Sequence, residues 1–429
     1  MLQTRAIVKA LGALFLAGCG SWAGARADRV DPGGEAAAAN LSAAWLLKPA
    51  GAHAGTVTAL AARHGFARAD RPDGRLHEIG WFRLVATRRA NPRSLRADPN
   101  VETIEPDPIR RMLPTEVLES QGVSLSLSVP YDDPFVQRQY AVPLIGLAAA
   151  HKVGRGSPGT VLAVLDAGVD GAHPDFRDGT GKSRVVPGFD AFAPAPGEAG
   201  KDRNGHGTHV AGIAAASANN GLGVVGVAPG VTILAEKVLS DQGSGTWSGV
   251  AEGILDAVAR RARVLNLSLG DPQSAKVLED ALAHAARHDV LVVAASGNDG
   301  QNRRQYPAAH PGVLAVGATT KADVLAGFSN HGDWLSVAAP GHLVYSTYPV
   351  GLKPYDYAYM SGTSMAAPHV AGLAALIRDL RPAWTARQVR EHIERTARDL
   401  GAPGFDPHFG SGRIEAGQAL EGLAGGTSR

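Results

Sequence analysis

The sequence predicts an α/β protein, in which a parallel β-sheet carries helices on both faces and a small α+β domain precedes it. From residue 160 onward, short apolar runs alternate with longer helical stretches. Strands that are apolar throughout are typical of parallel sheets buried on both faces. The chain has 429 residues, 45% of them hydrophobic, so it is long enough to bury such a core. Residues 41–107 carry their own set of strand-like and helical segments.

Residues 1–27 have the features of an export signal. Two basic residues precede the apolar run 10–18, which is too short to span a bilayer. The only cysteine, Cys19, ends a Leu-Ala-Gly-Cys stretch that resembles the bacterial lipoprotein signal, in which the cysteine is acylated. Cleavage after the Ala-Arg-Ala of residues 25–27 is the alternative. We therefore expect an exported bacterial protein that is anchored by lipid, with secretion as the alternative.

Residues 40–110 are expected to form a small domain. The strand-like AAWLLKP, the amphipathic TVTALAARHGF, the strand-like LHEIGWFRLVA and the stretch SLRADPNVETIEPD suggest a β-α-β-α-β order of ferredoxin-like type. Residues 111–131 contain Pro, Gly and Ser and lack helical periodicity, which indicates an exposed linker.

The main domain is expected to cover residues 132–423. Its strands are predicted at 160–165, 231–239, 263–269, 290–296 and 313–319. Its helices are predicted at 206–217, 246–260, 273–288, 363–379 and 385–398. In such sheets, binding sites lie at the carboxyl ends of the strands.

The charge of the chain points away from nucleic acid as a partner. Its 42 basic and 40 acidic residues leave a formal net charge of +2, and no dense basic block is present. No later apolar run is long enough to span a bilayer, and no internal repeat is found.

Three polar residues have the properties of a hydrolytic site. Asp166 ends the first strand of the main domain, where a carboxylate could equally cap a turn. His206 stands between two glycines, which predicts an accessible ring and a close approach of another segment. Ser364 precedes a helical run. Serine needs a base to take its proton, and a carboxylate holds the imidazole in the required tautomer.

Four stretches, LDAGVDGAHPDF, NGHGTHVAG, VVAASGND and SGTSMAAPHVAG, resemble the signatures of the subtilisin-like serine proteases, in the style of the thermitase and proteinase K branches. The resemblance spans residues 133 to about 420 and implies a subtilisin-like fold. It also implies a serine endopeptidase that cuts extended polypeptides through an acyl-enzyme, without a catalytic cofactor. In this comparison Asp166 orients the base His206, and Ser364 is the nucleophile.

The resemblance further implies an oxyanion hole made of the Asn298 side chain and the backbone N–H of Ser364. Asn298 beside a glycine is also compatible with a simple turn residue. Loss of the matching donor in a subtilisin costs about 10²–10³ in kcat. The family usually has Thr or Ser after the catalytic Asp, whereas this chain has Ala167, so we expect a modest loss of activity. Met365 beside the nucleophile is expected to make the enzyme sensitive to peroxide.

Two edge segments are implied to bind the substrate as an added strand, which predicts broad specificity. Their residues are Gly243, Ser244 and Gly245 in one segment and Ser268, Leu269 and Gly270 in the other. Trp247 and Gln305 match pocket-lining positions. A turn after each strand is the structural alternative for both segments.

One structural Ca²⁺ site is implied by the thermitase branch. Its ligands would be side chains of Asp133, Asp175 and Asn220 and carbonyls of Ser217, Leu222 and Val224. This donor set suits a hard cation that takes about 6–8 oxygens. The second, Asp-rich calcium loop of the family is replaced by FDAFAPAPGEAGKDRNG, so we expect one site only.

The stretch LRADPNVETIEPD resembles a subtilase pro-domain, which implies a domain that assists folding, inhibits the enzyme and is removed by it. A retained regulatory or adhesive domain is the alternative. Two other functions compete with hydrolysis: a catalytically silent homologue that acts as a binding module, and a peptide ligase or cyclase with the same triad. A monomer is expected.

Overall fold

The structure is a computed structural model that describes residues 44–51, 54–111, 116–118, 129–192, 200–352 and 356–423. The predicted signal segment with Cys19, and most of the predicted linker, lie outside these residues. In the part of the chain that is described, no helix is both long and apolar enough to cross a membrane.

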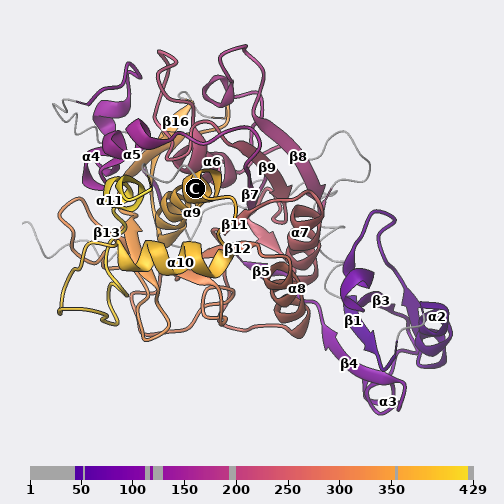
Figure 1. The fold of residues 1–429 in the computed structure, drawn as a ribbon. Helices are drawn as coiled ribbons and strands as arrows, with labels where there is room; N and C mark the ends of the chain where they lie inside the picture. Colours follow the sequence, from indigo (N-terminus) through magenta and orange to yellow (C-terminus); the bar gives the residue numbers. More distant parts are fainter. Residues whose placement is uncertain are drawn as a thin grey trace, which may run out of the picture. The chain divides into compact units, whose positions relative to one another are not determined.

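A seven-stranded parallel sheet forms the centre of the main domain (Figure 1). Its order is β14-β13-β12-β11-β7-β9-β8. The strands are β7 (Val161–Asp166), β8 (Val185–Asp190), β9 (Thr232–Lys237), β11 (Val264–Leu267), β12 (Leu291–Ala295), β13 (Leu314–Thr319) and β14 (Val337–Pro340). The five predicted strands are all present, which confirms the predicted fold class.

The two strands that lack a predicted counterpart, β8 and β14, are the two edges of the sheet. Each contains a proline: Pro187 interrupts β8, and Pro340 ends β14 after only three apolar residues. Proline removes a donor from the hydrogen-bond ladder and is tolerated at an edge because one side of the strand needs no partner.

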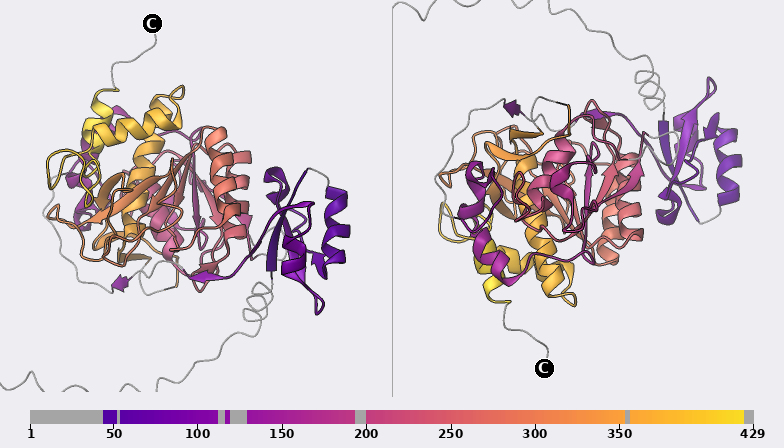
Figure 2. Two further views of the ribbon diagram at one scale, coloured as in Figure 1. Left: turned by 90° about the horizontal axis from the view of Figure 1, so that it is seen from below. Right: turned by 90° about the horizontal axis from the view of Figure 1, so that it is seen from above.

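Helices cover both faces of the sheet (Figure 2). On one face lie α7 (Trp247–Ala259) and α8 (Lys276–Arg287). On the other lie α6 (His206–Ala215) and α9 (Thr363–Leu380), together with α4 (Ala141–Leu144), α5 (Leu147–Val153), α10 (Ala386–Arg395) and α11 (Ala416–Glu421). All five predicted helices are therefore present.

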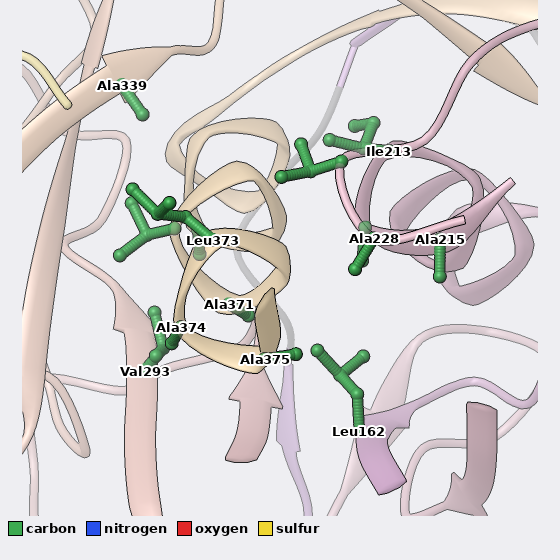
Figure 3. Close-up of a cluster of buried hydrophobic side chains, with 14 of the residues drawn as sticks. Leu162, Ile213, Ala215, Ala228, Val293, Ala339, Ala371, Leu373, Ala374 and Ala375 are labelled. Carbon is green, nitrogen blue, oxygen red and sulfur yellow. The ribbon is translucent and has the colours of Figure 1, made fainter. Parts of the chain in front are cut away.

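Helix α9 runs through the core, and its small residues permit the close packing around it (Figure 3). Ala375 points toward Leu162 of β7, and Leu373 and Ala374 lie on the side of the other strands. A Cβ on Gly372 would lie 2.8 Å from the Ala214 carbonyl oxygen of α6. Larger side chains along this helix would push α6 away, and α6 carries His206.

The N-terminal module, residues 44–111, has a sheet of its own. Its elements are β1 (Ala44–Pro49), α2 (Ala54–Arg63), β2 (Phe66–Arg68), β3 (Phe82–Ala86), α3 (Pro92–Arg96) and β4 (Val101–Pro106). The sheet is antiparallel in the order β2-β3-β1-β4, and the β-α-β-β-α-β sequence of elements is ferredoxin-like.

The predicted order of this module was incomplete. It lacked β2, and the first half of LHEIGWFRLVA is a 3₁₀ turn, Leu76–Ile79, rather than a strand. Gly80 ends this turn in a left-handed conformation at φ 80°, and β3 begins only after it.

The end of the predicted small domain and parts of the predicted linker pair with the main domain. β5 (Arg110–Arg111) pairs antiparallel with β10 (Ser244–Gly245). β6 (Glu116–Leu118) pairs antiparallel with β16 (Tyr357–Ser361), whose other neighbour is β15 (Val344–Thr347). Local sequence carries no sign of these pairings, because the partners are strand edges more than 100 residues away.

Candidate active site

Asp166 and His206 meet at the carboxyl edge of the sheet, and Ser364 contacts Ser268 just after the neighbouring strand β11. β7 is the first strand, β8 and β9 lie to one side of it, and β11 to β14 lie to the other. The carboxyl ends of β7 and β11 therefore form the topological switch point at which ligands bind in open α/β sheets. Asp166 is the last residue of β7, and α6 begins at His206.

Asp166 and His206 are in direct contact. The ring Nδ1 lies 2.8 Å from Oδ1 and 2.9 Å from Oδ2 of the carboxylate. The backbone N–H of Ala167 also donates to Oδ1, at 2.7 Å. When Nδ1 donates to the carboxylate, Nε2 is left as the base, which is the tautomer that proton abstraction needs.

The glycines on either side of His206 allow this contact. A Cβ on Gly207 would overlap the carbonyl oxygen of Gly168, and a Cβ on Gly205 would overlap the Tyr348 ring. Gly205 is also left-handed, at φ 100°. The predicted close approach is thus present, but the predicted accessible ring is wrong. His206 is only 3% exposed, because every residue of α6 is buried.

The charges around His206 favour its protonated form. Burial lowers the pKa of the ring, but the nearby Asp166 carboxylate, through its charge and its hydrogen bond, and the more distant Asp202 raise it. The net pKa lies above the usual value for histidine. This is the property expected of a base that must hold a proton during the reaction.

Ser364 lies in the first turn of α9, where backbone N–H groups lack partners within the helix. Its hydroxyl donates to the Ser268 carbonyl at 3.2 Å, and the Ser268 hydroxyl donates to the Ser364 carbonyl at 2.8 Å. His206 Nε2 is buried and has no hydrogen-bond partner among the described residues. A rotation of the Ser364 hydroxyl is therefore needed before the two residues form a hydrogen bond, as is common in the absence of substrate.

Asn298 Nδ2 and the backbone N of Ser364 both lie close to Gly362. The Asn298 Oδ1 accepts from the backbone N–H of Thr363 at 2.8 Å and from its hydroxyl at 2.9 Å, which fixes the orientation of the amide. A Cβ on Gly362 would lie 3.3 Å from Asn298 Nδ2 and 3.6 Å from Ser364 N. Two donors placed in this way can stabilise a developing oxyanion.

The two predicted edge segments line one pocket. It is bounded by Leu239, Gly245, Thr246, Trp247 and Val250 on one side, by Leu269, Gly270 and Asp271 on the other, and by Arg110 and Arg111. Trp247 is buried and donates from Nε1 to the Gln273 carbonyl at 3.0 Å. Gly243 has a left-handed conformation at φ 73° and completes the turn that leads into β10.

Gln305 lies elsewhere. It is buried, it donates to Asp299 at 2.9 Å, and its Cβ lies 3.7 Å from the position of a Cβ on Gly270. Gln305 does not line this pocket but lies beside Gly270 and Gly297, so its predicted role in substrate binding stays a prediction. Asp271, which also lines the pocket, was not predicted, because an acidic residue after a strand has no distinguishing pattern.

Comparison with known proteins identifies the family. The family model described as "Subtilase family" matches residues 157–412, more than half of the chain. The chain belongs to the subtilase family.

Among the relatives of this subtilase, thermitase of Thermoactinomyces vulgaris is 40% identical over 292 residues, which are 68% of this chain and 99% of thermitase. Subtilisin Savinase of Lederbergia lenta is 43% identical over 278 residues, 65% of this chain and 96% of Savinase. The crystal structure of fervidolysin from Fervidobacterium pennivorans superimposes with a TM-score of 0.75 at 27% identity. That match covers 88% of this chain and 61% of fervidolysin. The chain is a subtilisin-like serine endopeptidase.

The subtilase also gathers the residues predicted to bind calcium. Asp133 accepts from the backbone N–H groups of Asn219 and Asn220, at 2.9 and 3.3 Å. Asp175 accepts from the Asn220 side chain and from Val224 N, both at 2.9 Å. Leu222 N donates to the Asn220 Oδ1 at 3.0 Å, and Ser217 N donates to the Asp175 carbonyl at 2.8 Å. All six residues thus lie in one cluster.

The electrostatics of this cluster suit a hard cation. Asp133 and Asp175 are both buried, and burial raises the pKa of both carboxyls, that of Asp175 to about 7. The charge of Asp133 adds to the rise at Asp175. A divalent cation would offset both charges. In the described part of the chain, no group of three or more His, Cys, Asp or Glu side chains could hold a metal, so such a site would depend on amide and backbone oxygens.

Proposed function

We propose that this endopeptidase is exported as a zymogen, cuts itself between Arg111 and Glu116, and then hydrolyses extended polypeptides with Asp166, His206 and Ser364. The observation that carries the proposal is the pairing of two short strands with two parts of the candidate site. β5 pairs with the edge segment at Ser244 and Gly245, and β6 pairs with β16.

These pairings support self-cleavage because they follow the path of a substrate. β16 ends at Ser361, three residues before Ser364. β5 pairs with the first edge segment and β6 pairs with β16, the strand that precedes Ser364. Only residues 112–115 separate β5 from β6. An extended peptide that binds by backbone pairing on both sides would present the bond between its two paired parts to Ser364.

The proposed chemistry starts with proton transfer. His206 Nε2 takes the proton of the Ser364 hydroxyl as Oγ bonds to the carbonyl carbon, and Asp166 stabilises the imidazolium that results. Asn298 Nδ2 and Ser364 N donate to the oxygen that becomes negative. The C–N bond then breaks, and the imidazolium gives its proton to the leaving amine. Water, deprotonated by His206, hydrolyses the acyl-enzyme and restores Ser364.

The N-terminal module is proposed to inhibit the enzyme after the cut. Its Glu105 carboxylate accepts from the first two backbone N–H groups of α8, those of Lys276 and Val277, at 2.9 and 3.0 Å. Trp81 Nε1 and Lys48 Nζ each donate to Asp280 of the same helix at 2.9 Å. These contacts support a module that stays bound, with β5 in the substrate groove, until it is degraded.

Calcium is proposed to be held by the cluster of Asp133, Asp175, Asn220 and the carbonyls of Ser217, Leu222 and Val224. Bound there, it would supply positive charge and tie the segment that follows the linker to the main domain. The export signal supports a location outside the cytoplasm, with an acylated Cys19 or with secretion as the two possible outcomes.

The test compares the wild type with Ser364→Ala, both expressed without residues 1–27 and incubated with Ca²⁺. Intact mass should show that the wild type loses a fragment ending between Arg111 and Glu116, while Ser364→Ala stays whole. Two whole proteins, together with no hydrolysis of casein, would favour the silent binding module. Product masses also decide the remaining alternative, since a ligase or cyclase joins the acyl group to an amine and hydrolysis adds water.

A further inference from the structure

The side chain of Arg110 occupies a built subsite in the substrate groove. Its Nη1 lies 2.7 Å from the Asp271 Oδ1, and its guanidinium carbon lies 5.5 Å from the centre of the Trp247 ring. The side chains of Arg110 and Asp271 are only 16% and 21% exposed. Leu239, Val250 and Leu269 complete the walls of the pocket. The apolar walls can pack the alkyl part of an arginine, while Trp247 and Asp271 bind its charge.

The two groups that bind the charge are held in place by the same loop. Asp271 accepts from Gln273 N at 2.8 Å, and its backbone makes a two-way bridge with Tyr306, at 3.0 and 2.9 Å. Trp247 donates to the Gln273 carbonyl at 3.0 Å. Asp271 and Trp247 are therefore already held in position, so less conformational entropy is lost when a side chain binds in the subsite.

The neighbouring residue provides a contrast within the same strand. Arg111 is exposed, and among the described residues it makes no ion pair. Arg110 stands opposite Gly245 and Arg111 opposite Ser244. Successive side chains of a strand point to opposite sides, and although Arg111 also borders the pocket, among the described residues only Arg110 contacts both Asp271 and Trp247.

We propose that Asp271 is a specificity-determining residue that makes this enzyme prefer polypeptides with arginine at the substrate position opposite Gly245. The inference rests on the proposed function, because it assumes that β5 binds in the groove as the first substrate of the enzyme does. A bidentate or charge-assisted contact with a half-buried carboxylate discriminates well against neutral side chains, which would leave that carboxylate without its counter-charge. Cleavage in basic segments of polypeptides is the expected consequence, in place of the broad specificity that backbone pairing alone predicts.

The experiment uses the full chain after its own processing and a twelve-residue peptide with the sequence of residues 107–118, DPIRRMLPTEVL. Matched peptides carry Ala in place of the first or the second arginine. We expect kcat/KM to fall about tenfold when the first arginine is replaced and by less than about threefold when the second is replaced. The ratio of kcat/KM for the unchanged peptide to kcat/KM for the peptide without the first arginine should come close to one in Asp271→Asn. Asp271→Lys should favour a peptide with Glu in place of the first arginine.

A control variant and a second substrate separate the possible failures. Asp333→Asn alters an aspartate whose side chain is 80% exposed, and it should keep the wild-type ratio. If the wild type cuts casein but the ratio is near one, or if Asp271→Asn keeps it, Arg110 is only an anchor of the module and the inference is overturned. If neither casein nor the peptides are cut, the proposed function fails and this inference fails with it.

Discussion

Replacing Gly362 with alanine should fill the oxyanion hole of this subtilase. The added methyl carbon would lie 3.3 Å from Asn298 Nδ2 and 3.6 Å from Ser364 N. An oxyanion needs each donor at about 2.7–3.1 Å, so the methyl group competes for the same space. Loss of one donor costs about 10²–10³ in kcat, and we expect at least this loss for Gly362→Ala, with a smaller change in KM.

The assay is steady-state hydrolysis of a peptide amide by the processed enzyme, with folding checked by thermal unfolding. Gly312→Ala is the matched control, since its φ is also positive, at 89°, and nothing lies within 4 Å of its Cβ position, and it should leave kcat unchanged. Because the methyl and Asn298 act at one place, adding Asn298→Ala to Gly362→Ala should cost much less than Asn298→Ala costs alone. A folded Gly362→Ala enzyme with kcat within about threefold of the wild type would refute this account of the oxyanion hole.

Three further predictions concern pH, the module and calcium. The kcat/KM of the wild type should fall as the pH drops through the pKa of His206, because the protonated ring cannot act as a base. This pKa lies above the usual value for histidine. Asp166→Asn should move this acidic limb of the pH profile to lower pH and lower kcat by about 10⁴. Glu105→Gln should shorten by about tenfold the delay between self-cleavage, followed by intact mass, and the appearance of activity on peptides, because it weakens two hydrogen bonds to α8. Chelation of Ca²⁺ should lower the Tm by about 5–10 °C, and a scan of Asp175→Asn should show little response to Ca²⁺.

Each of these three has an outcome that counts against it. An acidic limb that stays in place in Asp166→Asn would show that this carboxylate does not set the pKa of His206. An unchanged delay in Glu105→Gln would mean that the contact with α8 does not hold the module. Equal responses to chelation in the wild type and Asp175→Asn would place the calcium site elsewhere.

The fold of the main domain could be predicted where its signals are local. The inner strands β7, β9, β11, β12 and β13 are mostly apolar because both faces are buried, although β9 ends in Glu236 and Lys237 and β11 contains Asn266. The edge strands β8 and β14 could not be found in this way. Pro187 interrupts β8, β14 has only three apolar residues before Pro340, and each strand is defined by its pairing with a distant strand.

In the candidate site, too, the features that depend on neighbouring residues could be predicted, and those that depend on distant contacts could not. Asp166 at the end of a strand, His206 between glycines and Ser364 before a helix are visible in the sequence, because each depends on a few neighbouring residues. Their types and order suffice to predict the chemistry. The contact of Asp166 with His206, by contrast, depends on how closely α6 approaches β7.

The sequence by itself therefore determined the parallel sheet, its helices and the family, and it identified the candidate catalytic residues. Only the tertiary structure decided that His206 is buried, that the Ser364 hydroxyl bonds to Ser268, and that Arg110 enters a subsite with Asp271 and Trp247. The physical reason is the range of the interactions. Apolar periodicity and glycine conformations are set by neighbouring residues, whereas a strand edge and a charged pocket are completed by partners more than 100 residues away along the chain.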